Sequence, residues 1–152
     1  MTLPPIGAPA PDFTLSSTSG SEVTLSKLRG KKVLLAFFPL AFTGTCTREL
    51  CAFSDDYGLF EGSDTVVLPI SVDAVPSLKE FKAKEKYSVD LLSDFKRVAS
   101  QAYGVLLEDK FYSARAYFII DAQGILRWSF VEQSTSNKRD NSELLAELKK
   151  VA

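Results

Sequence analysis

Two cysteines, Cys46 and Cys51, are the residues whose type and spacing indicate the most specific chemistry in this chain. They are the only cysteines among 152 residues, and the chain contains no histidine. A nucleophilic cysteine reacts as its thiolate, and here it cannot use a histidine as its base. A helix N-terminus, a cation or hydrogen bonds must therefore stabilise the thiolate. The second thiol, five positions further on, is a candidate to capture the product formed on the first.

The sequence around the cysteines predicts a helix from about Cys46 to Phe60. At about 100° per residue, Cys46 shares one face of this helix with four large apolar side chains, namely Leu50, Phe53, Tyr57 and Phe60. That face is expected to pack against the core, so Cys46 is expected at its buried end, in the first helical turn. Unpaired backbone N–H groups and the helix dipole favour a thiolate at this position.

Cys51 is expected to point away from the core face, about 140° around the helix from Cys46 and about 7.5 Å further along it. A disulfide requires Cα atoms within about 7 Å of each other. A bond between these two cysteines therefore requires the helix to unwind locally. Each cysteine also has a simpler interpretation, as a small buried hydrophobic residue, and this alternative is stronger for Cys51.

Three neighbours of Cys46 are candidates to complete a reactive site. Thr43 can aim its hydroxyl at the Cys46 sulfur, and Pro39, which follows a buried strand, can close one side of a pocket with its rigid ring. Glu49 can orient a nearby arginine. A metal site is a weaker alternative, because two thiols without histidine cannot complete a tetrahedral zinc site in one chain unless carboxylates are recruited. We expect neither a metal nor an organic cofactor.

The composition is that of an ordinary globular protein, with 45% hydrophobic and 24% charged residues. A single domain over residues 1–152 is the simplest expectation. The net charge of −1 and the lack of a basic stripe argue against a nucleic-acid partner. No apolar run approaches the roughly 18 residues needed to span a membrane, and the N-terminus does not resemble a signal peptide. We therefore expect a cytoplasmic protein, in which closely spaced thiols favour redox chemistry or metal binding over a structural disulfide.

Apolar periodicity and turn residues predict both strands and helices along the chain. The expected strands are residues 13–15 and 22–25, paired as an N-terminal β-hairpin, and then 32–38, 65–72, 117–120 and 125–131. Besides the helix at Cys46, the expected helices are residues 76–86, residues 97–103 closed by Gly104, and a last helix capped by Ser142. This order predicts an α/β fold with a mixed central β-sheet and helices on both faces. It resembles the thioredoxin-like fold, which places a reactive cysteine where the first buried strand ends and the next helix begins.

The pattern Pro-x-x-x-Thr-x-x-Cys, formed by Pro39, Thr43 and Cys46, resembles the active-site signature of the peroxiredoxin family. The resemblance covers nearly the whole chain, because further segments are similar to family landmarks in the same order: residues 7–13, 71–73, 91–94, 102–105 and 118–121. Residues 38–46 are most similar to the alkyl hydroperoxide reductase E group. The Cys-x4-Cys spacing instead resembles the bacterioferritin-comigratory (Q-type) peroxiredoxins.

The resemblance implies a further site residue and a mechanism. Arg115 stands where the family places its active-site arginine, and the alternative is a strand-end arginine that reaches solvent. The family implies a thiol-dependent peroxidase, in which Cys46 reduces hydrogen peroxide or an organic hydroperoxide and becomes a sulfenic acid. Cys51 then forms an intramolecular disulfide with it, which thioredoxin or a glutaredoxin-like protein reduces. Because the two similar subfamilies differ in assembly, both a monomer and a homodimer are expected alternatives.

Three other functions remain open from the sequence. In a one-cysteine peroxiredoxin, an external thiol resolves Cys46 in place of Cys51. A thiol–disulfide oxidoreductase of thioredoxin type usually has a Cys-x-x-Cys motif and a cis-proline before the strand that here starts near Ala116, but the motif is missing and no proline follows Pro76. A non-enzymatic binding or holdase domain predicts ordinary thiol reactivity at Cys46. A peroxide consumption assay with a dithiol reductant distinguishes a peroxidase from the last two of these functions.

Overall fold

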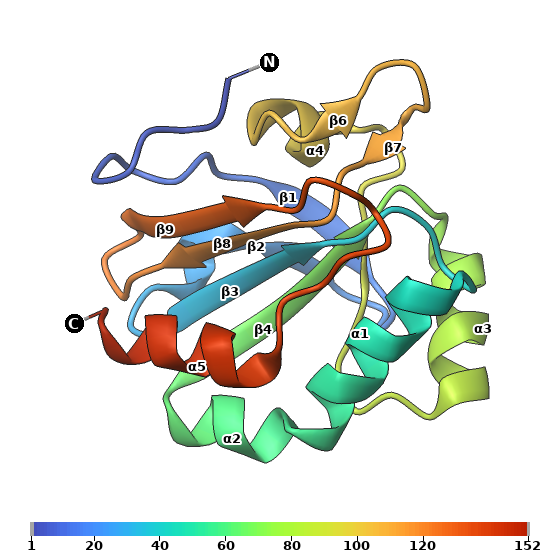
Figure 1. Cartoon of the computed structure of the whole chain (residues 1–152), viewed down its shortest axis with the longest axis horizontal. Helices are drawn as coiled ribbons and strands as arrows, with labels where there is room; N and C mark the ends of the chain where they lie inside the picture. Colours follow the sequence, from blue (N-terminus) through green and yellow to red (C-terminus); the bar gives the residue numbers. More distant parts are fainter. Residues whose placement is uncertain (1, 152) are drawn as a thin grey trace.

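A seven-stranded mixed β-sheet forms the centre of the molecule in the computed structural model, which describes residues 2–151 (Figure 1). Its strands follow the spatial order β2-β1-β5-β4-β3-β8-β9. Their bounds are Thr14–Ser17 (β1), Glu22–Thr24 (β2), Lys32–Phe37 (β3), Thr65–Ser71 (β4), Leu92–Ser93 (β5), Ala116–Ile120 (β8) and Leu126–Val131 (β9). A separate antiparallel pair consists of β6 (Leu106–Leu107) and β7 (Tyr112–Ser113). The predicted mixed sheet and N-terminal hairpin are confirmed.

Helices cover both faces of the sheet, as the order of the elements predicted. One face carries α1 (Gly44–Asp55), α2 (Tyr57–Gly62), α3 (Val75–Glu85) and α5 (Asn141–Lys149). The other face carries α4 (Val98–Ala102) and the short 3₁₀ helix η1 (Leu25–Leu28). In Figure 1, α1, α2 and α5 lie together along one side of the sheet, and α4 lies on the opposite side of the molecule. The two layers enclose two apolar cores, one on each side of the sheet.

β3 is the strand that leads into the cysteine-containing helix, and it lies at the most buried place in the sheet. It pairs in parallel with β4 and antiparallel with β8. Leu34 and Ala36 join the core beneath α1 and α5, whereas Leu35 and Phe37 join the core on the other face. Successive side chains of a strand point to opposite faces, and strands that are covered on both sides are apolar throughout. The continuous apolar run thus becomes a central strand, as predicted.

The helix predicted from Cys46 to Phe60 is wrong in its extent, because the chain forms two helices there. α1 begins at Gly44, two residues earlier than predicted, and it ends at Asp55. Asp56 separates α1 from α2 with a non-helical backbone (φ −100°, ψ 14°). The side-chain amide of Asn141 donates to the Ala52 carbonyl and to the Asp56 carboxylate, both at 2.9 Å. These tertiary contacts satisfy the end of α1 and hold the break.

The last helix was predicted with Ser142 as its cap, and this detail is wrong. α5 begins at Asn141, and Asp140 is its N-cap residue with an extended backbone. The Asp140 carbonyl accepts the N–H groups of Glu143 and Leu144, which places Ser142 inside the first turn. The helix itself is confirmed, and its core-facing leucines, Leu144 and Leu148, are fully buried.

The turn between β8 and β9 forms at residues 121–124, in the gap between the predicted strands 117–120 and 125–131. One carboxylate oxygen of Asp121 accepts the N–H groups of Gln123 and Ile125, each at 2.9 Å. The other accepts the Arg127 side chain at 2.7 Å. Gly124 has a positive φ of 85°, a conformation that suits glycine. The buried Asp121 side chain therefore fixes the hairpin that joins β8 to the edge strand β9.

Candidate active site

Cys46 lies just after the junction between the central strand and the following helix. β3 ends at Phe37, and a short loop leads to Thr43, the N-cap residue of α1. Cys46 is the third residue of α1 and is fully buried. Within residues 2–151, the first-turn N–H groups of Gly44, Thr45 and Cys46 have no hydrogen-bond acceptor. These donors and the helix dipole create a positive potential that favours a thiolate at Cys46.

Arg115 brings a positive charge into direct contact with the Cys46 sulfur. Its Nη2 donates to Cys46 Sγ at 3.0 Å, although the two residues are 69 positions apart in the sequence. The side chain is only 1% exposed, so the alternative of an arginine that reaches solvent is wrong. The carbonyl of Thr135 accepts both Nε, at 3.1 Å, and Nη2, at 3.0 Å. The loop after β9 therefore fixes the guanidinium over the thiol.

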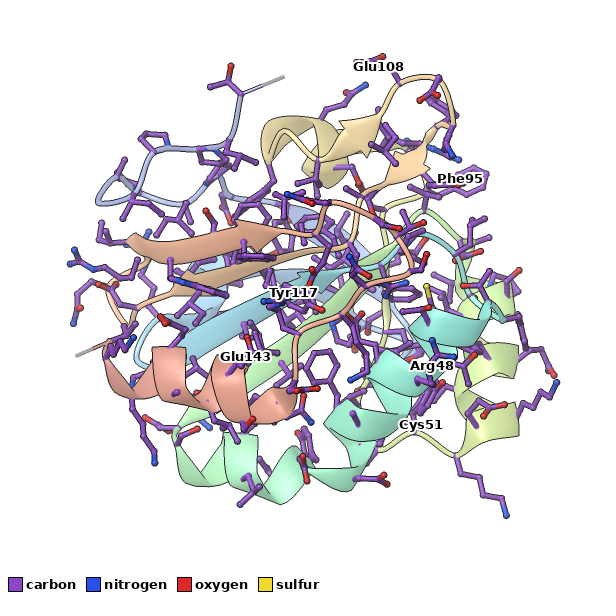
Figure 2. All side chains as sticks on the ribbon, in the orientation of Figure 1. Arg48, Cys51, Phe95, Glu108, Tyr117 and Glu143 are labelled. Atoms are coloured by element: carbon purple, nitrogen blue, oxygen red, sulfur yellow. The ribbon has the colours of Figure 1, made fainter. Side chains whose placement is uncertain are left out.

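Glu49 holds the other side of the same guanidinium. Its Oε1 accepts Nη1 of Arg115 at 3.0 Å, in an ion pair whose two side chains are almost fully buried. Its Oε2 accepts the hydroxyl of Tyr117 at 2.6 Å, and that hydroxyl in turn accepts the backbone N–H of Arg139 at 2.9 Å. Figure 2 shows Tyr117 at the central sheet. A continuous buried network thus runs from the loop after β9 to Cys46.

Burial and charge act in opposite directions on the members of this network. Burial raises the pKa of Glu49 above its ordinary value, although the charge of Arg115 and the Tyr117 hydroxyl act to lower it. Burial acts to lower the pKa of Arg115, but the negative charges of Glu49 and Cys46 outweigh it and raise that pKa. Burial and the Glu49 charge raise the pKa of Tyr117. Arg115 is therefore a permanent cation, and Tyr117 is a permanent hydrogen-bond donor.

An open pocket of about 200 Å³ leads from the surface to this network. Pro39 and Thr43 line it from the loop before α1, and Arg115 and Thr135 line it from the opposite side. Pro39, Thr43 and Arg115, all selected from the sequence, thus meet at one pocket, and Arg115 connects this pocket to the buried Cys46.

The hydroxyl of Thr43 does not make the contact that the sequence suggested. It donates to the Leu40 carbonyl at 2.8 Å, three residues earlier in the same loop, and not to the Cys46 sulfur. A hydroxyl whose hydrogen is used in this way still has lone pairs that can accept a hydrogen bond. Thr43 therefore offers the pocket an acceptor, whereas Arg115 and the first-turn N–H groups of α1 offer donors.

Cys51 lies on the same intact helix as Cys46, and both are free thiols. It is partly buried, and in Figure 2 it lies at α1, outside the central sheet. Its Sγ donates to the hydroxyl of Tyr87 at 4.0 Å, and that hydroxyl donates to the Thr47 carbonyl at 3.1 Å. The helix therefore keeps the two thiols in separate surroundings.

Comparison with known proteins assigns this arrangement to a family. The model of the AhpC/TSA family matches residues 6–129. The chain belongs to this family. It is 44% identical over 131 residues to alkyl hydroperoxide reductase E of Mycobacterium tuberculosis, covering 84% of this chain and 86% of that protein. It is 35% identical over 127 residues to the putative peroxiredoxin bcp of Coxiella burnetii, covering 80% and 84%.

A solved structure shows the same relationship. The reduced 2-Cys peroxiredoxin of Plasmodium vivax superposes with a TM-score of 0.88 at 31% identity, covering 95% of this chain and 80% of that one. The chain is therefore a peroxiredoxin, a thiol-dependent peroxidase with a thioredoxin-like fold. Its similarity to both the E group and the bacterioferritin-comigratory group is confirmed. The assignment excludes the non-enzymatic holdase and the thioredoxin-type oxidoreductase as alternatives.

Two contributors to the peroxiredoxin site were not identified from the sequence. Tyr117 lies in a strand that is otherwise apolar, Ala116–Ile120, and that setting is the one signal that its hydroxyl has a buried partner. Thr135 contributes its backbone carbonyl, a group that every residue has and that the sequence therefore does not reveal.

None of the helices in the described part of the chain is long and apolar enough to cross a membrane.

Proposed function

We propose that this peroxiredoxin reduces hydrogen peroxide and organic hydroperoxides at Cys46. The Cys46 thiolate attacks the terminal peroxide oxygen, the O–O bond breaks, and its electron pair leaves on the other oxygen as hydroxide or alkoxide. The leaving oxygen takes a proton from water, and Cys46 becomes a sulfenic acid. The contact of 3.0 Å between Arg115 and Cys46 carries this proposal, because the same arginine donates to the sulfur and lines the pocket.

The pocket offers each part of a peroxide a suitable partner. Arg115 and the N–H group of Cys46 can stabilise the negative charge that develops on the leaving oxygen. The lone pairs of Thr43 can accept the peroxide O–H, and the ring of Pro39 limits the approach to one direction. The thiolate and both peroxide oxygens can thereby align for an in-line displacement.

We further propose that Cys51 resolves the sulfenic acid. The Cys51 sulfur attacks the Cys46 sulfur, the S–O bond breaks, and the departing hydroxide leaves as water with the thiol proton. Cys51 is the only other thiol in the chain, so only Cys51 can form an intramolecular disulfide. Thioredoxin or a glutaredoxin-like dithiol protein then reduces the disulfide by exchange. A cytoplasmic location, where such reductants act, is part of this proposal.

A peroxide consumption assay coupled to a dithiol reductant tests the first step. Cys46→Ser should abolish turnover while the fold remains intact. Substantial remaining activity in this variant would place the nucleophile elsewhere. Cys51→Ser serves as the matched thiol control, since it should still consume one equivalent of peroxide.

Treatment with one equivalent of peroxide tests the second step. The parent should become a monomeric chain that has lost two hydrogens and has no free thiol, whereas Cys51→Ser should stop at the sulfenic acid. The separation of the two thiols on one intact helix favours a second candidate, the one-cysteine mechanism. If the parent accumulates sulfenic acid while Cys51 can still be alkylated, an external thiol resolves Cys46.

A further inference from the structure

The helix that carries both cysteines is held from outside by side chains that bind its backbone carbonyls. Tyr87 Oη donates to the Thr47 carbonyl and Ser88 Oγ donates to the Ser54 carbonyl, each at 3.1 Å. Both belong to the segment that follows α3. On the other side, Asn141 donates to the Ala52 carbonyl. α1 is therefore fastened along its length, and local unwinding must release some of these contacts.

Among these side chains, Tyr87 contacts both the backbone of α1 and the Cys51 thiol. In an α-helix the N–H of residue i donates to the carbonyl of residue i−4, so the Thr47 carbonyl is the acceptor for the backbone of Cys51. The hydroxyl of Tyr87 binds this same carbonyl, and it also receives the Cys51 thiol at 4.0 Å. One phenol thus contacts both the helical turn that must open and the sulfur that must move.

The surroundings of Tyr87 hold its hydroxyl in a fixed position. Its ring is buried in the core beneath α1 and meets Phe81 edge-on, with centroids 5.2 Å apart. Burial and the neighbouring Cys51 raise the pKa of Tyr87, so the phenol stays protonated. It therefore does not act as a base toward the Cys51 thiol, and its contribution is one of position.

We propose that Tyr87 is a positioning residue for the resolving step, which keeps Cys51 in the helical, reduced arrangement until its hydrogen bonds open. This inference rests on the proposed role of Cys51. The chemistry of that step is unchanged: the S–S bond forms, the S–O bond of the sulfenic acid breaks, and water leaves. Tyr87 affects how often the helix opens, and hence how long the sulfenic acid is exposed to a second peroxide molecule.

The variant Tyr87→Phe removes the hydroxyl and keeps the buried ring. A hydrogen bond of ordinary strength corresponds to about a three- to tenfold change in an equilibrium, so disulfide formation after one equivalent of peroxide should become about three- to tenfold faster. The fraction of Cys46 that is overoxidised at high peroxide should fall. The rate at which Cys46 first reacts with peroxide should stay at the parent value, which a general loss of structure does not predict.

Tyr57→Phe is the matched control, because Tyr57 lies in α2 beside the same core and its hydroxyl makes no hydrogen bond within residues 2–151. It should leave both rates unchanged. Amide hydrogen exchange in the reduced protein provides a second measurement, since residues 47–51 should exchange faster in Tyr87→Phe than in the control.

Two outcomes overturn the proposal, and they are distinguishable. If the parent forms the disulfide and Tyr87→Phe forms it at the same rate or more slowly, then Tyr87 does not restrain the helix. If the parent itself forms no disulfide between Cys46 and Cys51, the proposed role of Cys51 fails first and the role of Tyr87 falls with it.

Discussion

The guanidinium of Arg115 lies 3.0 Å from the sulfur of Cys46 and forms an equally short ion pair with Glu49. In a buried site, the charge of one cation must compensate both the carboxylate and the thiolate, because a buried charge without a partner is destabilising. The charge of the site therefore depends on the thiol as well as on the ion pair. This relationship decides how substitutions at the site should behave.

Removal of Arg115 should impair both catalysis and stability. Arg115→Met should slow the reaction of Cys46 with peroxide by about 10² to 10³-fold, the usual effect of removing one stabilising donor. It also leaves the Glu49 carboxyl buried without its cation, so this group must either stay charged and unpaired or take up a proton, and the free energy of unfolding should fall by about 3–5 kcal/mol. Stopped-flow kinetics and urea unfolding measure the two effects.

The double variant Arg115→Met/Glu49→Gln provides the control for this prediction. It removes both charges, so most of the lost stability should return while the peroxide reaction stays slow. If the double variant recovered activity together with stability, Arg115 would serve the fold and not the chemistry.

The hydroxyl of Tyr117 should act on the site through Glu49. Tyr117→Phe removes the donor to Glu49 and leaves the N–H of Arg139 without its partner. The free energy of unfolding should fall by about 1–3 kcal/mol, and the peroxide reaction should slow far less than in Arg115→Met. Urea unfolding and stopped-flow kinetics check both expectations. A rate loss as large as that of Arg115→Met contradicts this indirect role.

Asp121 should give the protein part of its stability at neutral pH. Burial acts to raise the pKa of Asp121, but the N–H of Ile125, the Arg127 side chain and the N–H of Gln123 outweigh it, and the pKa lies below its ordinary value of 3.8. A carboxyl with a lowered pKa in the folded state stabilises the fold above its unfolded pKa, and the stabilisation is lost as the pH falls through the folded pKa.

Asp121→Asn should therefore reduce the free energy of unfolding by about 1–3 kcal/mol at neutral pH. The difference from the parent should shrink as the pH falls below 3.8, which urea unfolding across that range measures. Asp109→Asn is the matched control, since Asp109 is exposed and should leave the stability unchanged at each pH. A difference that is the same at every pH would contradict a contribution from the ionised carboxylate.

The two redox states should differ in the cysteine-containing helix. Because a disulfide between Cys46 and Cys51 is incompatible with an intact helix, residues 46–53 should be protected from amide exchange in the reduced protein and should exchange much faster after oxidation. β3 should keep its protection in both states. Equal protection of the helix before and after oxidation would show that it persists and that the disulfide does not form.

The position of the reactive cysteine could be predicted from the local sequence, because the pattern of apolar and polar residues shows where a strand ends and a helix begins. The apolar run of β3 followed by Pro39, Thr43 and Cys46 predicts a thiol at a strand–helix junction. The position of Arg115 beside it was implied by family resemblance, since nothing in the local sequence relates the start of β8 to the start of α1. The catalytic roles of these residues stay predictions.

The parts that were missed depend on tertiary contacts. The break at Asp56 is held by Asn141, which comes from the far end of the chain. β5, β6 and β7 contain two residues each, too few for a periodic pattern to appear. The contact between Thr43 and the Leu40 carbonyl depends on the path of a loop, which residue types alone do not determine.

The presence of both cysteines in α1 also has a thermodynamic consequence for the proposed cycle. The reduced state keeps the helix and its outside contacts, whereas the disulfide state gives them up. Every 1.4 kcal/mol or so that stabilises the helical state raises the reduction potential of this two-electron couple by about 30 mV. Asn141 does not touch either sulfur, but it binds the Ala52 carbonyl and so stabilises the helical state. It therefore helps to determine how readily a dithiol protein reduces the disulfide.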